Sequence, residues 1–341
     1  MKAVRVRNKE MVVEDVIKPK AGHSEVVLKV RYCGICGSEV HRFEAGSFPE
    51  GAICGHEPYG VIDEVGEGVE GWKKGDRVVV IGYEPCRKCR WCQQGEYQLC
   101  LKKEWIGIGT NPGGFAEYVK VYASMLVPVP GQINDRSAVL TEPVAVALHA
   151  VRSTHINIGD TVAVIGSGPI GLLVLQCLKM AGARTVGVIE AAKARRDLAA
   201  KLGADVIFAP EMKNIGLEVT RALGAEPDVV FDCAGGITTL QNAIELVRPH
   251  GKVMLVGVSM QPVSIIPIEW GRKEAVLKTS IAYRDEFRLA LELIAKGKIE
   301  VESLISDIIS FNEVGQTIKA LNRPNQQIKI LVDPELGVSE A

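Results

Sequence analysis

The chain has 341 residues, of which 47% are hydrophobic and 24% are charged, and its formal net charge is −1. This length is enough for two domains with a sizeable core, and the composition is ordinary for a soluble globular enzyme. The near-neutral charge provides no electrostatic footprint for nucleic acid or for an anionic membrane, so we expect neither as a partner.

Features that would direct the chain out of the cytoplasm are not evident in the sequence. No apolar run reaches transmembrane length, and the opening MKAVRVRNKE lacks the apolar core of a secretory signal. Nine cysteines, four of them in a tight cluster with metal-ligand spacing, favour a reducing compartment over a disulfide framework. We therefore expect a cytoplasmic protein.

The first 140 residues are rich in β-branched residues and glycine, and their helical periodicity is weak. Short strands between turn residues are predicted at 26–32, 60–65, 77–81 and 115–121. We expect this part to form a compact, irregular β domain.

The hydrophobic pattern of the sequence changes near residue 142, where helical and strand patterns begin to alternate. Helices are predicted at 142–155, 169–181, 193–202 and 286–296. Strands are predicted at 161–165, 184–189, 229–233, 252–256 and 327–332. The alternation indicates an α/β unit with a doubly wound parallel sheet.

Four cysteines fall within fifteen residues in the pattern C-x2-C-x2-C-x7-C: Cys86, Cys89, Cys92 and Cys100. Four thiolates this close can complete a tetrahedral zinc shell, and such a shell leaves no open position. We therefore expect a structural zinc. An iron–sulfur cluster is the competing interpretation, because thiolates also hold those clusters.

A second, scattered set of candidate ligands comprises Cys36, His56, Glu57 and Glu142. Thiolate, imidazole and carboxylate are all zinc ligands, although each residue taken alone is also consistent with a buried cysteine, a core histidine or a surface carboxylate. Glycines flank Cys36 and His56 and let the backbone approach closely. Glu142 begins an apolar run, where a carboxylate needs a partner. The set predicts an open, catalytic zinc site.

The strand at 161–165 is followed by G-S-G-P-I-G, with Gly166, Gly168 and Gly171, and then by a helix that opens with Pro169 and Ile170. In this context the motif is a dinucleotide-binding fingerprint. Its glycines permit the turn, the approach of a pyrophosphate and close helix–strand packing. The phosphates would lie at the helix N-terminus.

Glu190 ends the next predicted strand and bears on the choice of cofactor. An acid there accepts hydrogen bonds from the ribose hydroxyls and repels a 2′-phosphate, which favours NAD over NADP. Arg195 could stack on adenine. Alternatively, Arg195 and Arg196 could bind a 2′-phosphate, or they could be solvated helix residues.

Together these motifs resemble the medium-chain zinc-dependent dehydrogenases over nearly the full length of the chain. The resemblance is carried by C-G-I-C-G-S-E-V-H (33–41), G-H-E (55–57), the four-cysteine lobe, G-G-F-A-E-Y (113–118), E-P-V-A-V-A-L-H-A (142–150) and G-S-G-P-I-G (166–171). It is strongest to the polyol, butanediol and threonine dehydrogenase branch, since Glu142 stands where the primary-alcohol branch has a cysteine-type ligand.

The resemblance implies three parts for the chain. A GroES-like β-barrel catalytic domain would occupy residues 1–150 and contain the structural zinc lobe at 86–100. A Rossmann NAD-binding domain would span 151–286. The C-terminal segment, 287–341, would complete the catalytic domain.

The resemblance also implies roles for individual residues. Cys36 and His56 would be firm ligands of the catalytic zinc, while Glu57 and Glu142 would share or exchange the carboxylate position. Ser38 and His41 match the family's proton relay. The positions that match the family's NAD contacts are Ile170, Glu190, Arg195, Val256, Gly257, Val258, Ala282 and Tyr283.

We predict reversible, NAD-dependent oxidation of a secondary alcohol in a small polyol, diol or sugar alcohol. Zinc would lower the pKa of the substrate hydroxyl, and Ser38 would accept its proton and pass it by way of the cofactor ribose to His41. Arg42 and Arg284 motivate a sugar acid or phosphorylated polyol as an alternative substrate, although both could be surface charges. Further alternatives are a threonine dehydrogenase-like activity, zinc-free enone or quinone reduction, and a non-catalytic nucleotide-binding protein on the same fold.

The resemblance implies a homodimer or a homotetramer. Residues 253–256 and the segment near 279–282 are the candidate sheet edges for pairing between subunits.

Overall fold

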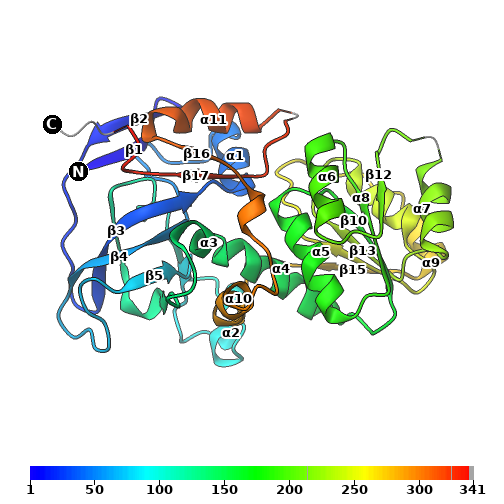
Figure 1. Ribbon diagram of the computed structural model, residues 1–341, viewed down its shortest axis with the longest axis horizontal. Coiled ribbons are helices and arrows are strands. Elements are labelled where there is room, and N and C mark those ends of the chain that lie inside the picture. The colour runs from blue at the N-terminus through cyan, green and yellow to red at the C-terminus, as the bar shows by residue number, and fades with distance from the viewer. Residues whose placement is uncertain (213, 324, 338–341) are drawn as a thin grey trace. The chain divides into compact units, whose positions relative to one another are not determined.

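The computed structural model describes residues 1–212, 214–323 and 325–337 (Figure 1). The chain divides into two compact units. The first comprises Met1–Glu142, Phe287–Asn325 and Lys329–Ala341, and the second comprises Pro143–Glu286 and Gln326–Ile328. Across the described ranges, no helix combines the length and the apolar character that crossing a membrane requires.

The first unit is built on a seven-stranded sheet in the order β16-β17-β3-β4-β5-β9, with β8 paired to β3. Two small two-stranded sheets, β1-β2 and β6-β7, accompany it. The strands are β1 (Lys2–Arg7), β2 (Glu10–Asp15), β3 (Glu25–Gly34), β4 (Glu57–Val65), β5 (Arg77–Val80), β6 (Tyr83–Glu84), β7 (Glu104–Trp105), β8 (Tyr118–Tyr122), β9 (Leu126–Pro128), β16 (Ile305–Ile309) and β17 (Lys329–Val332). The helices are α1 (Gly37–Glu44), α2 (Arg90–Gln93), α3 (Asp135–Val139), α10 (Glu286–Ala295) and α11 (Val314–Leu321).

Strand β3 forms the centre of this unit. Its residues Val26, Leu28 and Val30 alternate into the core, as the two-residue period of a strand requires. The C-terminal strand β17 pairs antiparallel with the end of β3, where Leu331 lies opposite Gly34. The last part of the chain is therefore a structural element of the first unit.

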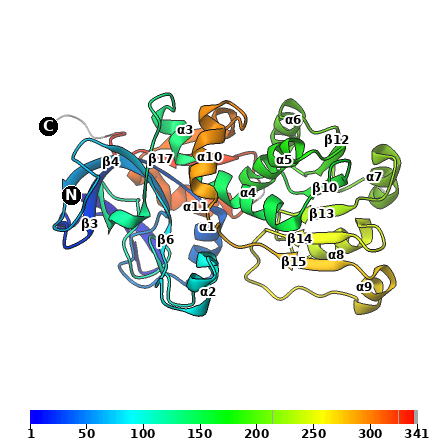
Figure 2. The same cartoon turned by 90° about the horizontal axis from the view of Figure 1, so that it is seen from below.

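The second unit contains one parallel sheet of six strands in the order β12-β11-β10-β13-β14-β15. Figure 2 shows β10, β13, β14 and β15 following one another across it. The strands are β10 (Thr161–Ile165), β11 (Thr185–Ile189), β12 (Val206–Phe208), β13 (Val229–Asp232), β14 (Lys252–Leu255) and β15 (Val276–Thr279). The helices are α4 (Thr141–Thr154), which begins at the end of the first unit, α5 (Pro169–Ala181), α6 (Lys193–Lys201), α7 (Ile215–Leu223), α8 (Thr239–Leu246) and α9 (Pro267–Lys273).

Strand β10 is buried along its whole length, as expected for a central strand of a parallel sheet. Its residues Ala163 and Ile165 belong to a core that includes residues of α7 and α8. Helix α5 follows with Pro169 in its first turn and ends at Gly182, whose φ of +93° is the left-handed C-cap conformation. These local signals place the N-terminus of α5 at the end of the central strand.

The predicted doubly wound parallel sheet is confirmed, and β10 and α5 have the predicted bounds. The prediction that residues 253–256 form a sheet edge is wrong, because β14 lies between β13 and β15. The predicted strand near 279–282 is also misplaced, since β15 ends at Thr279. Helix α1 lies in a region whose weak periodicity had suggested strands and turns.

Candidate functional site

The four-cysteine lobe brings together the sulfur atoms of Cys86, Cys89, Cys92 and Cys100, all within 4.8 Å of one another. The Sγ atoms of Cys89 and Cys92 are 3.6 Å apart, and those of Cys86 and Cys92 are 4.0 Å apart. Tetrahedral zinc with four thiolates requires separations of about 3.8 Å. All four are free thiols, so the arrangement fits a closed zinc shell.

Backbone groups in the lobe favour the thiolate form of Cys86 and Cys89, whereas burial raises the pKa of Cys92 to about 12. The N–H groups of Lys88 and Cys89 lower the pKa of Cys86 to about 6, and the N–H of Cys92 lowers the pKa of Cys89. Thiolates are the form that binds metal. The sulfur separations therefore fit a structural metal ion, and a bound cation would favour the thiolate form of Cys92 as well.

The scattered set comes together in the first unit. Ligand atoms of Cys36, His56 and Glu57 lie within 4.8 Å of one another. Cys36 caps helix α1, Glu57 is the first residue of β4, and His56 immediately precedes that strand. A thiolate, an imidazole and a carboxylate make a three-ligand set with an open position, which is the arrangement of catalytic zinc sites.

Glu39 orients this ligand set, although sequence reasoning missed it. Its fully buried carboxylate accepts hydrogen bonds from the Nδ1 of His56 at 2.9 Å and from the backbone N–H groups of Cys36 and Gly55, both at 2.9 Å. A carboxylate on Nδ1 fixes the imidazole so that Nε2 is presented to a metal. The detectable signal was an acid three residues after Cys36, which is the capping-box spacing.

Lys329 is a second residue that the sequence reasoning missed. Its ammonium forms an ion pair with Oε2 of Glu57 and donates to the carbonyl of Ile35 at 2.9 Å. Burial, the largest single influence, lowers the pKa of Lys329, but the charges of Glu57, Cys36 and Glu142 and the hydrogen bond to Glu57 together leave the pKa above its ordinary value. A side chain at Gly34 would collide with this pair, because a Cβ there would lie 2.8 Å from Cε of Lys329.

Glu142 is buried near the start of α4, but its carboxylate is not part of the set within 4.8 Å. Burial, reinforced by the neighbouring charge of Glu57, raises the pKa of Glu142 to about 7. A cation in the site would favour the ionised form of this carboxyl. In this geometry Glu57 belongs to the ligand set and Glu142 lies outside it.

Helix α1 carries both predicted relay residues. Ser38 and His41 are three residues apart and so lie on the same face of the helix. Oγ of Ser38 is buried and has no hydrogen-bond partner among the residues that the structure describes. A buried, unpartnered hydroxyl is costly unless it serves a ligand.

The two arginines that suggested an anionic substrate each contact an oxygen atom in their own unit. Nη1 of Arg42 lies 3.5 Å from the carbonyl oxygen of Ile108, and Nε of Arg284 lies 3.8 Å from Oδ1 of Asp285. These contacts do not favour a sugar-acid or phosphate clamp.

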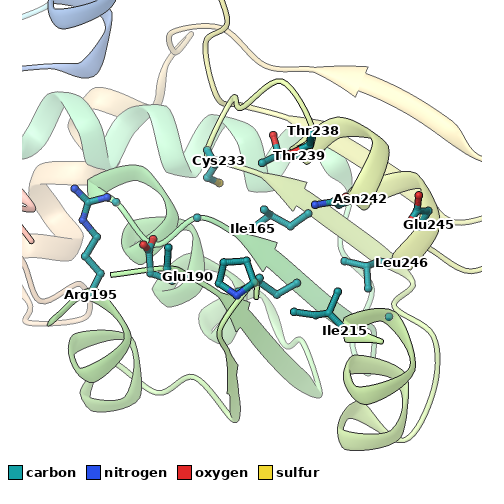
Figure 3. Close-up of a pocket in the computed structure, with 17 residues that line it drawn as sticks. Ile165, Glu190, Arg195, Ile215, Cys233, Thr238, Thr239, Asn242, Glu245 and Leu246 are labelled. Atoms are coloured by element: carbon teal, nitrogen blue, oxygen red, sulfur yellow. The ribbon is translucent and has the colours of Figure 1, made fainter. Parts of the chain in front are cut away.

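The second unit contains a cavity of about 390 Å³ at the fingerprint (Figure 3). Four predicted cofactor residues line it: Gly166, Gly168, Glu190 and Arg195. Gly171 packs against the carbonyl of Gly166, which leaves no room for a side chain there. The cavity lies where the fold binds dinucleotides, at the carboxyl ends of the parallel strands.

Glu190 is held rigidly at the edge of this cavity. Its Oε2 accepts from the N–H of Ser167 at 2.7 Å, and its Oε1 accepts from the N–H of Ala192 at 2.8 Å. Arg195 donates through Nε to the carbonyl of Gln327 at 2.9 Å. Nη1 of Arg196 donates to the backbone carbonyl of Glu190 at 2.8 Å, so this guanidinium is already bonded to the main chain.

The remaining predicted cofactor residues do not line the cavity: Pro169, Ile170, Gly171, Val256, Gly257, Val258, Ala282 and Tyr283. Tyr283 is buried, and Ala282 has a φ of +52°. Residues that the sequence reasoning missed line the opposite wall and include Thr238, Thr239 and Asn242 (Figure 3). They lie at the start of α8, whose position relative to the fingerprint depends on tertiary folding.

Two family models match the chain. "Alcohol dehydrogenase GroES-like domain" matches residues 22–131, and "Zinc-binding dehydrogenase" matches residues 169–296. The chain is 35% identical to (R,R)-butanediol dehydrogenase of Bacillus subtilis, with 98% of this chain and 100% of the relative covered. It is 33% identical to sorbitol dehydrogenase of Halalkalibacterium halodurans, with 94% and 95% covered.

Solved structures agree with these matches. The crystal structure of 2R,3R-butanediol dehydrogenase from Bacillus subtilis has a TM-score of 0.88 at 34% identity, with 98% of this chain and 99% of that chain covered. The crystal structure of a zinc-binding dehydrogenase from Sinorhizobium meliloti 1021 bound to NADP has a TM-score of 0.90 at 32% identity, with 98% of this chain and 99% of that chain covered.

The chain belongs to the medium-chain, zinc-binding alcohol dehydrogenase family, in its polyol branch. The predicted family and the GroES-like and Rossmann fold classes are confirmed. The protein is a zinc-dependent oxidoreductase that acts on the CH–OH group of a small molecule and uses a nicotinamide cofactor.

Proposed function

We propose that this protein oxidises a secondary alcohol of a small diol or polyol to the ketone. The alcohol loses a hydride to NAD⁺ and a proton to the protein, giving ketone, NADH and H⁺. The observation that carries the proposal is the set of Cys36, His56 and Glu57, together with the buried hydroxyl of Ser38 two residues after Cys36. Similarity to the butanediol and sorbitol dehydrogenases supports the substrate class.

Each side chain of the site has a proposed task. Zinc held by Cys36, His56 and a carboxylate would polarise the substrate hydroxyl and lower its pKa. Ser38 accepts the hydroxyl proton, and His41 delivers it to solvent. The residues involved fit a metal, because Glu39 already fixes the imidazole of His56.

The cysteine lobe has a different proposed task. Cys86, Cys89, Cys92 and Cys100 hold a structural zinc, because four thiolates leave no position for substrate. We also propose the division into a catalytic domain at 1–150, a cofactor domain at 151–286 and a completing segment at 287–341, which limited proteolysis would test.

We propose NAD as the preferred cofactor. The carboxylate of Glu190 is buried, fixed by two backbone N–H groups and directed to the fingerprint cavity. An acid at this position pairs with ribose hydroxyls and repels a 2′-phosphate. The NADP-bound relative makes a direct comparison of the two cofactors necessary.

We propose that the protein is a homodimer or a homotetramer in the cytoplasm. Strand β15 is an edge strand of the parallel sheet, and its residues Val276 and Leu277 are 57% and 41% exposed. Unpaired, exposed apolar edges are normally covered, and a second copy of the strand would cover this one. Light scattering on the native chain and on Leu277→Lys tests this assembly.

A substrate screen tests the proposed reaction. Purified, zinc-replete protein is assayed for NAD⁺ and NADP⁺ reduction with vicinal diols, neutral polyols, threonine, sugar acids and primary alcohols. The proposal predicts the highest kcat/KM for a neutral secondary alcohol with NAD⁺. A preference for primary alcohols or for sugar acids would contradict it.

A further inference from the structure

We propose that Lys329 is a positioning residue of the open metal site. Its ammonium is a built-in counter-ion of Glu57 that competes with the metal for this carboxylate and so sets how tightly the site holds zinc. The inference rests on the proposed function, because it takes Cys36, His56 and Glu57 to be the place where zinc binds.

The burial of Lys329 calls for an explanation. Its side chain is 2% exposed and that of Glu57 is 1% exposed. Lysine is almost never buried to this degree unless it is paired. Stability is a weak explanation for the pair, because replacing a buried ion pair with apolar residues of similar volume is often neutral or stabilising.

The ammonium of Lys329 contacts two of the segments that carry or adjoin the ligands. The ammonium pairs with Oε2 of Glu57 and donates to the carbonyl of Ile35, the residue before Cys36. The stem of the side chain runs past Gly34, where a Cβ would lie 2.8 Å from Cε of Lys329. The end of β3 is thus shaped to let a lysine from β17 reach the ligand set.

Charge determines the expected effect on metal binding. A fixed positive charge beside a dication repels it, and the ammonium must share Glu57 with the metal. When the ammonium is removed, the buried carboxylate of Glu57 loses its counter-ion in the metal-free protein. In the zinc-bound protein the metal takes the place of that counter-ion. Removal of the ammonium therefore raises the free energy of the metal-free state more than that of the zinc-bound state. Loss of the ammonium should therefore tighten zinc binding at this site.

The test compares zinc affinity in the native chain, Lys329→Met and Lys329→Arg by competition with a chelator. We expect Lys329→Met to bind zinc at the open site on the order of tenfold or more tightly. Lys329→Arg retains the positive charge and should therefore bind zinc with the affinity of the native chain. Cobalt substituted at the open site should show a changed visible spectrum in Lys329→Met and a native-like spectrum in Lys329→Arg.

Two controls separate this role from a general effect. Affinity at the four-cysteine site should be the same in every variant. Lys319→Met removes an exposed lysine of α11 that pairs with Glu10, and it should leave both sites unchanged. If Lys329→Met does not fold, Lys329→Gln removes the same charge while keeping a hydrogen-bond donor.

A double-mutant cycle tests whether Lys329 acts through Glu57. The gain in affinity should largely vanish when Lys329→Met is made in a Glu57→Gln background. Unchanged or weaker zinc binding in folded Lys329→Met or Lys329→Gln would overturn the inference, as would an equal gain from Lys329→Met in both backgrounds. Lack of zinc at the open site of the native chain would overturn the proposed function as well.

Discussion

Glu286 should contribute measurable, pH-dependent stability to the second unit. It is 1% exposed and accepts from Nδ1 of His149 at 3.2 Å, Nη1 of Arg152 at 3.0 Å and the N–H of Arg284 at 2.7 Å. Burial raises its pKa, but these donors and the charge of Arg152 lower it from an ordinary value of 4.5 to about 2.

The expected magnitude follows from this lowered pKa. The difference between 4.5 and about 2 corresponds to about 3 kcal/mol. The side chain of Arg152 is 45% exposed, so water screens part of its charge, and we expect about 2 kcal/mol. Because the folded-state pKa is depressed, this stability is fully present above pH 4.5 and is lost as the pH falls toward 2.

The assay is urea unfolding of Glu286→Gln and the native chain at pH 7 and pH 4, with equal zinc in all samples. The variant should be about 2 kcal/mol less stable at pH 7, with a smaller deficit at pH 4. Glu292→Gln is the matched control on α10, because its side chain is 55% exposed and pairs with Lys296 across one turn, so it should cost less than about 0.5 kcal/mol. Equal stability of Glu286→Gln and the native chain at pH 7, or a deficit independent of pH, would refute the reasoning.

Three further predictions concern the site. Ser38→Ala should lower kcat about 100-fold or more while zinc content, measured by atomic emission, stays native, and normal turnover would exclude the relay role. Glu190→Gln should lower the ratio of kcat/KM for NAD⁺ to that for NADP⁺ about tenfold, because the charge that repels a 2′-phosphate is lost, and an unchanged ratio would argue against this role. Cys92→Ser should reduce zinc from two to one per chain and lower the thermal midpoint, whereas retention of both metals would show that the lobe is not a zinc shell.

Local patterns predicted the parts of the fold that local physics determines. The buried strand β10, the glycine turn and the Pro169 start of α5 have strong signals within a few residues, and their bounds were correct. The edge of the parallel sheet could not be predicted in the same way. β14 and β15 are both short strands, and their order depends on how the sheet is wound.

The residues of the candidate site also divide into those that local sequence patterns could identify and those that depend on tertiary folding. Cys36, His56 and Glu57 were found because their residue types and flanking glycines are unusual together. Glu39 was missed although its spacing from Cys36 was visible, since an acid in a first helical turn is also a common helix signal. Lys329 could not be found locally, because β17 reaches Glu57 only through pairing with β3.

The most direct test of the central claim is the rate of NAD⁺ reduction by the best secondary alcohol as zinc is restored to the metal-free protein. The account predicts that one zinc per chain, held by the cysteine lobe, supports no turnover and that activity rises in proportion to the second. Full activity with one zinc or with none would contradict the account, because the open site would then be dispensable for the reaction.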